Sequence, residues 1–153
     1  MAHNTIRLMD YSNKFKERTL KSAAYAGMLM AETTNAGEVE PHSSAGDTDV
    51  QRMFLFEKEL EGKEIDTELT ADERVQVWYP LPGDEVYAIL ADGQNAVRGN
   101  KLASNGDGTL QVLDTAGATV AYALEDVDTS ASSALESEGP RGDYTRRIKV
   151  QVA

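Results

Sequence analysis

Short apolar runs separated by turn residues fill the stretch 75–124, and this pattern constrains the fold more than any other feature of the sequence. Each run is four to six residues long and is followed within a few positions by Gly, Asn, Asp or Pro. The runs lie at 75–79, 86–90, 97–102, 110–113 and 119–124. Such spacing is typical of short antiparallel strands, and no run is long enough for an ordinary helix. The sequence therefore predicts an all-β fold, a small antiparallel β-barrel or sandwich.

The first half of the chain carries weaker strand signals. Residues 19–32 are rich in Ala, Leu and Met, but Gly27 would cost a helix about 1 kcal/mol relative to Ala. We therefore expect a strand, a turn at Gly27, a second strand, a turn at 35–37 and a third strand. The apolar run 53–56, bounded by charged residues, predicts a further buried strand.

Three segments outside these runs complete the predicted architecture. The acidic stretch 57–72 is expected to be an excursion that packs lightly on the body of the protein. Residues 126–143 are poor in apolar side chains and rich in Ser, Glu and Gly, which predicts a mobile loop. Residues 145–152 alternate between apolar and polar side chains, which predicts a closing strand with one buried face.

Length and composition limit the class of protein. A chain of 153 residues fits one domain. It contains no cysteine, which excludes disulfides, thiolate metal sites and cysteine nucleophiles. No apolar stretch approaches the roughly 18 residues of a membrane span, and the N-terminus lacks the apolar segment of a signal peptide. We therefore expect a soluble chain with no membrane partner.

The formal net charge of −11 is unevenly distributed. Residues 1–25 hold five basic and two acidic side chains, residues 26–140 hold six and 23, and residues 141–153 hold four and one. An acidic body argues against nucleic acid as the partner, because phosphate binding needs a basic surface. The acidity serves either solubility or adaptation to high salt.

Residues 1–15 show apolar anchors without a clear period, so they predict an N-terminal arm attached to a single β-domain of residues 16–153. The alternative is a frayed end. The candidate contact residues of the arm are Ile6, Arg7, Leu8, Met9, Tyr11 and Phe15. Ordering such an arm on a partner requires that the burial of these anchors exceed the entropy cost of fixing the backbone.

Few residues suggest chemistry. The two histidines, His3 and His42, stand alone in polar segments, so neither is expected to bind a metal. The sequence at 105–108 resembles part of a calcium loop but lacks the later acidic ligands, and a hairpin turn explains it better. Acidic pairs occur without a Ser-His-Asp set, a phosphate-binding Gly loop or a dinucleotide motif. We expect no enzyme activity and no cofactor.

The order of these segments resembles the capsid decoration, or cement, proteins of tailed double-stranded DNA viruses. The resemblance extends from about residue 21 to 124 and consists of short, glycine-containing motifs in the same order. These motifs lie at 27–29, 37–43, 54–60, 74–78, 82–86, 99–102 and 106–110.

The resemblance implies a β-domain of the kind called a β-tulip, which sits on the capsid exterior, commonly as a homotrimer. A terminal arm then contacts neighbouring capsid subunits, and the major capsid protein is the partner. The implied location is the virion, with assembly in the host cytoplasm. The implied function is to stabilise the shell by bridging capsid subunits.

A homotrimer is also expected because Met28, Met30, Ile65 and Leu69 lie in segments poorly placed to bury them within one chain. Two rival functions remain open. One is a carbohydrate- or ligand-binding β-module that uses Trp78 or Tyr79 as an aromatic platform. The other is a small β-barrel hydrolase, which would show a pocket where two carboxylates converge.

Overall fold

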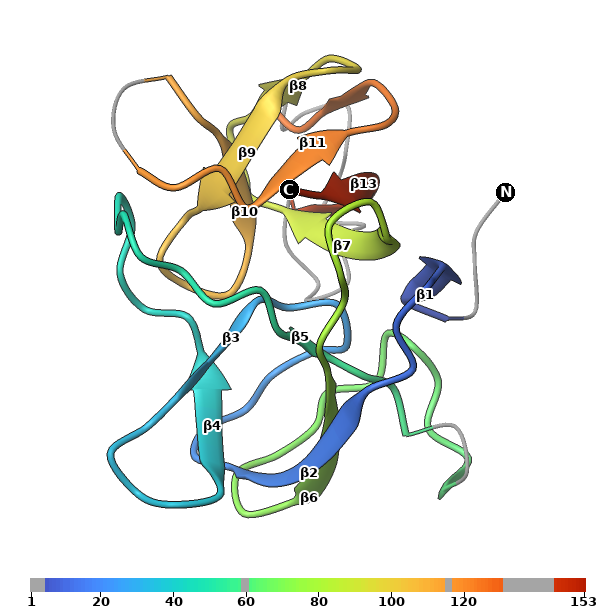
Figure 1. Ribbon diagram of the computed structural model, residues 1–153, viewed down its shortest axis with the longest axis vertical. Coiled ribbons are helices and arrows are strands. Elements are labelled where there is room, and N and C mark those ends of the chain that lie inside the picture. Colours follow the sequence, from blue (N-terminus) through green and yellow to red (C-terminus); the bar gives the residue numbers. More distant parts are fainter. Residues whose placement is uncertain (1–4, 59–60, 115–116, 131–144) are drawn as a thin grey trace.

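The computed structural model describes residues 5–58, 61–114, 117–130 and 145–153, and these residues form strands, turns and loops (Figure 1). The all-β prediction is confirmed. The strands are β1 (Arg7–Met9), β2 (Phe15–Leu20), β3 (Met30–Glu32), β4 (Glu38–Pro41), β5 (Phe54–Leu55), β6 (Arg74–Trp78), β7 (Glu85–Leu90), β8 (Asn95–Ala96), β9 (Lys101–Ser104), β10 (Leu110–Val112), β11 (Ala121–Ala123), β12 (Val127–Asp128) and β13 (Arg146–Val152).

Five strands in the upper half of Figure 1 close into a barrel, in the order β7-β10-β9-β11-β13. The barrel closes because β13 pairs with β7 along its length, from Arg146 opposite Leu90 to Gln151 opposite Glu85. Strand β1 adds to the other edge of β7, with a bulge between Arg7 and Met9. We call the five strands β7, β9, β10, β11 and β13 the upper barrel.

Strands β2 to β6 form a second sheet in the lower half of Figure 1, in the order β3-β4-β2-β6-β5. Its two end strands are also joined, because Leu29 and Phe54 form an antiparallel bridge. The amide of Leu55 donates to the carbonyl of Met28 at 3.0 Å, and the amide of Met30 donates to the carbonyl of Met53 at 2.8 Å. These bonds close the sheet into what we call the lower ring.

The sequence predicted an antiparallel fold, but two of the strand pairs are parallel. Strand β2 is parallel to β4, and β10 is parallel to β7 at a single residue pair. The first exception arises because β3 lies between β2 and β4 in the chain and pairs antiparallel with β4. A strand inserted between two others in sequence reverses the chain twice, so the outer two run in the same direction.

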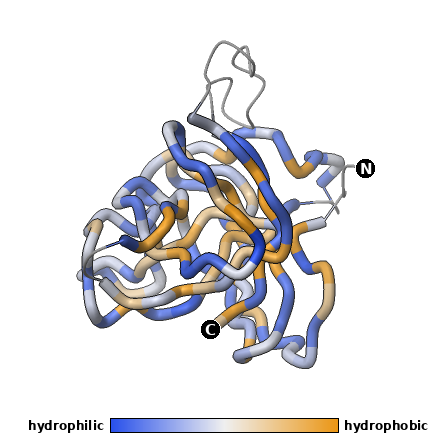
Figure 2. The backbone as a smooth tube through the Cα atoms, turned by 90° about the horizontal axis from the view of Figure 1, so that it is seen from above, coloured by the Kyte–Doolittle hydropathy of each residue, from blue (hydrophilic) through white to orange (hydrophobic). Residues whose placement is uncertain are grey.

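Alternating side chains give the two halves interlocked cores, and Figure 2 shows apolar and polar residues interspersed along the backbone. The upper core contains most inward side chains of the barrel, together with Leu29, Phe54 and Trp78 from the lower half. The lower core contains Val75 and Val77 of β6, and it also receives Ile89 from β7. Each half therefore supplies part of the core of the other.

A glycine is required where the halves meet. Gly27 has φ of +90°, which side chains with a Cβ rarely adopt. A Cβ at this position would lie 2.6 Å from the carbonyl oxygen of Tyr87 and 2.7 Å from a guanidinium nitrogen of Arg147. Both atoms belong to the junction, since Arg147 also donates to the carbonyl of Ala26 at 2.8 Å. The predicted turn at Gly27 is confirmed, and its role is close packing of the two halves.

The N-terminal segment differs from the predicted arm. Ile6 is fully buried in the upper core, Arg7–Met9 pair with β7, and Phe15 begins β2. The boundary predicted between residues 15 and 16 therefore falls inside a strand. Sequence periodicity missed this because three residues of β1 are too few to show an alternating pattern.

The four surplus apolar residues are also accounted for within the chain. Met28, Met30 and Leu69 are 3%, 0% and 2% exposed and lie in the lower core, while Ile65 is 9% exposed and lies in the upper core. The acidic stretch 57–72 is therefore anchored in both cores where it is described. These residues no longer support a trimer, which stays a prediction. Most of the predicted 126–143 loop lies outside the described residues, and its first residues form β12 and a turn.

Candidate contact surface

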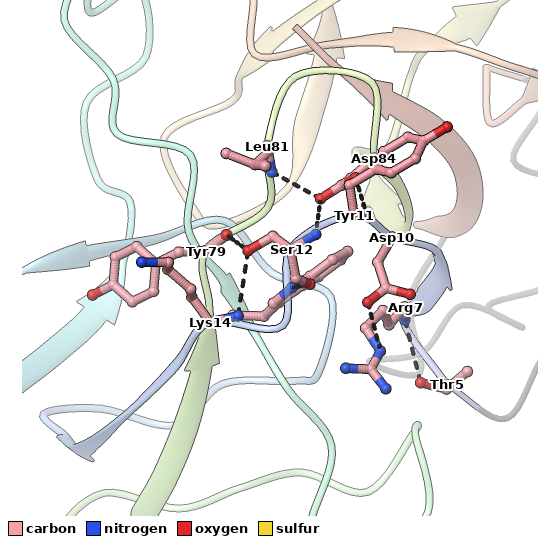
Figure 3. A network of polar contacts seen from close by, with 10 residues as sticks. Thr5, Arg7, Asp10, Tyr11, Ser12, Lys14, Tyr79, Leu81 and Asp84 are labelled. Carbon is pink, nitrogen blue, oxygen red and sulfur yellow. Dashed lines mark hydrogen bonds and ion pairs between the residues drawn. The ribbon is translucent and has the colours of Figure 1, made fainter.

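The N-terminal segment crosses from the upper barrel to the lower ring beside the turn between β6 and β7, and Asp84 fixes this crossing (Figure 3). Asp84 is fully buried. Its Oδ1 accepts a hydrogen bond from the amide of Tyr11 at 2.7 Å. Its Oδ2 accepts from the amides of Ser12 at 3.3 Å and Leu81 at 2.8 Å. One carboxylate thus joins two segments that are about seventy residues apart in the sequence.

Ser12 and Trp78 extend this network. The hydroxyl of Ser12 donates to the carbonyl of Tyr79 at 2.8 Å and accepts from the amide of Lys14 at 3.3 Å. The carbonyl of Ser12 accepts from the indole Nε1 of Trp78 at 3.0 Å. Buried polar groups that are paired in this way fix a single local geometry.

Two residues of the network, and Met9 two positions before Tyr11, carry exposed apolar side chains. Tyr11, Leu81 and Met9 are 76%, 51% and 48% exposed, whereas most large apolar side chains of the described residues are buried. Figure 3 shows Tyr11 and Leu81 on either side of Asp84. We call Met9, Tyr11 and Leu81 the contact surface. Exposed aromatic and aliphatic groups on a rigid support are typical of protein-binding sites.

The six predicted contact residues divide into two groups. Met9 and Tyr11 are exposed, whereas Ile6, Arg7, Leu8 and Phe15 are buried or half-buried. Phe15 packs edge to face against Phe56, with ring centroids 4.9 Å apart, and the guanidinium of Arg7 lies 5.3 Å from the Phe15 ring centre. Arg7 also forms an ion pair with Asp10 at 3.7 Å. These internal contacts attach the segment to its own domain.

Leu81 was missed by the sequence analysis, which treated 80–84 only as a strand-ending turn. The available signal was an apolar residue inside the turn at 80–84, because turns lie at the protein surface. Its proximity to Tyr11 depends on Asp84 and could not be inferred from spacing.

The predicted aromatic platform is not formed as expected. Trp78 is fully buried and its indole nitrogen is bonded inside the protein. The Tyr79 ring is half-buried under the ammonium of Lys16, 5.1 Å from the ring centre, and burial raises the pKa of its phenol. Trp78 therefore presents no open face of the kind that binds sugars, and Lys16 lies over the ring of Tyr79.

A hollow of about 280 Å³ lies beside the lower ring and is lined by three carboxylates, those of Glu17, Glu57 and Glu61. Glu17 pairs with Arg74 at 3.0 Å and Glu61 with Lys58 at 2.7 Å. The Oε2 of Glu57, a buried residue, accepts from the amide of Ile6 at 3.2 Å. Two of these carboxylates are therefore engaged in ion pairs, whereas Glu57 holds the N-terminal segment through one oxygen and its Oε1 is buried without a hydrogen-bond partner.

The structure brings together a serine, a histidine and an aspartate that are not adjacent in sequence. His42 Nδ1 lies 2.6 Å from the hydroxyl of Ser104, and His42 Nε2 lies 3.7 Å from Asp47. Ser104 is 2% exposed and also accepts from the amide of Gly106, so its hydroxyl is enclosed. Burial lowers the pKa of His42. The group links the loop after β4 to the hairpin after β9.

The predicted hairpin at 105–108 is confirmed, since it connects β9 to β10 and the amide of Asn105 donates to the carbonyl of Thr109 at 2.9 Å. Among the described residues, no group of three or more His, Asp or Glu side chains is arranged to hold a metal ion. His3 lies outside the described residues. In the same part of the chain, no helix is long and apolar enough to cross a membrane.

No protein-family model and no curated protein sequence matches this chain. Its fold is similar to a solved structure, the N base of head fiber gp8.5 of bacteriophage phi29. The TM-score is 0.55, with 16% sequence identity, and the alignment covers 92% of this chain and 93% of that chain. The likeness therefore extends over nearly the whole of both chains, and this protein has the fold of a bacteriophage head fiber base.

Proposed function

We propose that this protein is a structural component of a bacteriophage virion that binds the outside of the capsid. The observation that carries the proposal is the likeness of nearly the entire chain to a phage head fiber base. It is supported by a contact surface of exposed apolar side chains, and in the hollow beside the lower ring Glu17 and Glu61 are engaged in ion pairs.

The finer part of the proposal is that the protein stabilises the shell by bridging subunits of the major capsid protein. Fully burying one large apolar side chain contributes about 1.5–3 kcal/mol, so the three residues of the contact surface supply a useful part of a binding energy. If the protein forms homotrimers on the shell, three such surfaces act together and slow dissociation strongly. This role needs no catalysis, cofactor or nucleic acid.

The test is binding to empty shells assembled from the major capsid protein of the virus that encodes this chain. We expect the purified protein to sediment with the shells, and we expect Tyr11→Ser combined with Leu81→Ser to reduce bound protein about tenfold or more. Tyr122→Ser is the matched control, because Tyr122 is 39% exposed but lies on β11 of the upper barrel. Failure of the wild-type chain to sediment with shells would reject the proposal.

A homotrimer is tested separately by light scattering on the free protein and by cryo-microscopy of decorated shells. A monomer in both settings would reject trimer formation while leaving capsid binding intact.

A further inference from the structure

We infer that Asn105 is a site of self-modification, at which its side-chain amide is lost as ammonia through a succinimide, with Ser104 and His42 acting as the base. The inference goes beyond the proposed function and does not depend on it. Asn105 is the one asparagine of the sequence that is followed by glycine. Glycine has no side chain to hinder attack of its backbone nitrogen on the preceding side-chain amide, so ring closure is fastest at an Asn-Gly pair.

A chain of hydrogen bonds leads from the attacking nitrogen to a buried imidazole. The amide of Gly106 donates to the hydroxyl of Ser104 at 3.2 Å. The hydroxyl of Ser104 lies 2.6 Å from Nδ1 of His42, and Nε2 of His42 lies 3.7 Å from a carboxylate oxygen of Asp47. A neutral imidazole with its proton on Nε2, toward the carboxylate, accepts at Nδ1 from the serine hydroxyl. Each group is then oriented to pass a proton from Gly106 to His42.

Burial restricts what this group can act on. Ser104 is 2% exposed and His42 is 6% exposed, so an external substrate does not reach the hydroxyl, whereas the backbone of Gly106 already contacts it. Burial lowers the pKa of His42 and the nearby Asp47 opposes this shift, so the imidazole is neutral at pH 7 and can accept a proton. Asn105 and Gly106 are half-buried, so water reaches the ring that they form.

The reaction balances within the chain and one water molecule. The nitrogen of Gly106 bonds to Cγ of Asn105, and its proton passes to the oxygen of Ser104. At the same time the hydroxyl proton of Ser104 moves to Nδ1 of His42. The Cγ–Nδ2 bond then breaks, and the proton returns from His42 through Ser104 to the departing nitrogen, which leaves as ammonia. Water opens the succinimide at either carbonyl, and the product at position 105 is aspartate or isoaspartate.

The modification changes the hairpin between β9 and β10. The side-chain amide of Asn105 donates to Oδ1 of Asp107 at 3.3 Å. Conversion to an acid removes this donor and places a second carboxylate beside Asp107, where like charges repel. The isoaspartate product also lengthens the main chain of the hairpin by one CH₂ group. The modified chain carries one more negative charge, so ion exchange separates it from the unmodified chain.

The first experiment incubates the wild-type protein at neutral pH and follows each asparagine by peptide mapping and mass spectrometry. Asn35 and Asn100 are internal controls, because both lie in or next to turns but are followed by Ala and Lys. We expect conversion at Asn105 to be at least about tenfold faster than at either control. Equal rates would overturn the inference, and so would an Asn105 that stays intact while the free peptide of residues 102–110 is converted.

The second experiment separates a base from a restraint, because the two roles of Ser104 predict opposite results. If its hydroxyl only restrains the amide of Gly106, Ser104→Ala frees that amide and conversion becomes faster. If the hydroxyl passes the proton on, Ser104→Ala slows conversion about tenfold or more. We expect the slower rate, and a faster or unchanged rate would overturn the role of Ser104. Gln111→Ala is the matched control, because Gln111 Nε2 donates to the carbonyl of Ser104 at 3.1 Å and does not lie on the proton path.

His42 acts through Ser104, so its test is a pH profile. Conversion driven by hydroxide rises steadily with pH, whereas conversion driven by the imidazole levels off at high pH and falls below about pH 6.5 as His42 gains a proton. We expect the second profile in the wild type and the first, with lower rates, in His42→Gln. Asp47→Asn should move the fall to lower pH, because Asp47 favours the protonated imidazole. The wild-type profile needs no substitution, and a steady rise in it would overturn the role of His42.

Discussion

The upper barrel and the lower ring are both closed, but they differ in the backbone contacts that close them and in the residues of their cores. The barrel closes through a long strand ladder between β13 and β7. The ring closes through a single bridge and neighbouring backbone bonds. Their cores differ too: the lower core contains Met28, Met30 and Met53, whereas the upper core contains branched aliphatic residues, alanines and aromatic rings. Methionine is flexible and fills irregular space, so it suits the half with the less regular sheet.

Despite this difference, the core of each half contains side chains from the other half. Trp78 and Phe54 of the ring lie in the upper core, and Ile89 of the barrel lies in the lower core. The two halves therefore differ in the regularity of their sheets, but each contributes side chains to the packing of the other. The predictions below either disrupt the packing between the halves or measure how the two cores differ.

The largest effect is expected for Trp78→Ala, which removes the largest buried side chain and leaves the Ser12 carbonyl without its indole donor. We expect a loss of about 3–5 kcal/mol in the free energy of unfolding. Chemical denaturation followed by circular dichroism measures it. The same experiment should show one transition for both variant and wild type, and two resolved transitions in the wild type would contradict a shared core.

A somewhat smaller loss is expected for Gly27→Ala at the junction. The new Cβ would meet backbone and Arg147 atoms at under 3.0 Å in addition to the strain of a positive φ, so we expect a loss of about 2–4 kcal/mol. Gly93→Ala is the matched control, because Gly93 has φ of +77° and open space around it. The difference between the two variants isolates the clash, and equal losses would mean that packing at Gly27 contributes nothing.

Exchanging leucine and methionine compares the two cores directly. Met30→Leu in the lower core should cost less than about 1.5 kcal/mol, because the volume is conserved and neighbouring methionines can adjust. Leu102→Met in the upper core should cost more, because its neighbours there are stiffer. Thermal unfolding of both variants checks this order, and the reverse order would refute the proposed difference in adaptability.

The smallest effects concern pH, and they separate the contact between His42 and Ser104 from an ion pair of the lower ring. Burial lowers the pKa of His42, so the unfolded chain binds more protons near neutral pH, and stability should begin to fall as the pH drops below about 6.5. In the ring, the ammonium of Lys63 lowers the pKa of Glu73 to about 2, so its contribution should be lost only between about 4.5 and 2. Melting midpoints at pH 7, 5.5 and 3.5 distinguish these windows.

Two variants assign those pH effects. His42→Asn should flatten the change between pH 7 and 5.5, and Glu73→Gln should flatten only the change below pH 4.5. A wild-type midpoint that is constant from pH 7 to 5.5 would rule out the effect expected for His42.

The sequence predicted those elements whose signal is local. The runs around Val75, Val86 and Leu110 became strands, and the turns at Gly27 and 35–37 were placed correctly. It did not predict features that depend on distant partners. Burial of Ile6 depends on β7 and Glu57, closure of the ring depends on Leu29 meeting Phe54, and the contact surface depends on Asp84. Of the predicted contact residues, Met9 and Tyr11 are exposed, but their neighbour Leu81 carried no spacing that linked it to them.

The closure of the upper barrel and of the lower ring also limits how copies of this protein can aggregate. An open sheet edge offers unpaired N–H and C=O groups to a neighbouring chain, and proteins held at high local concentration are the most vulnerable to such pairing. Among the described strands, open edges remain on β1, which is three residues long and bulged, on the two-residue strands β8 and β12, and on the part of β2 before Thr19, which β4 does not reach. Edges this short hold few hydrogen bonds, so densely packed copies have little backbone through which to stick to one another.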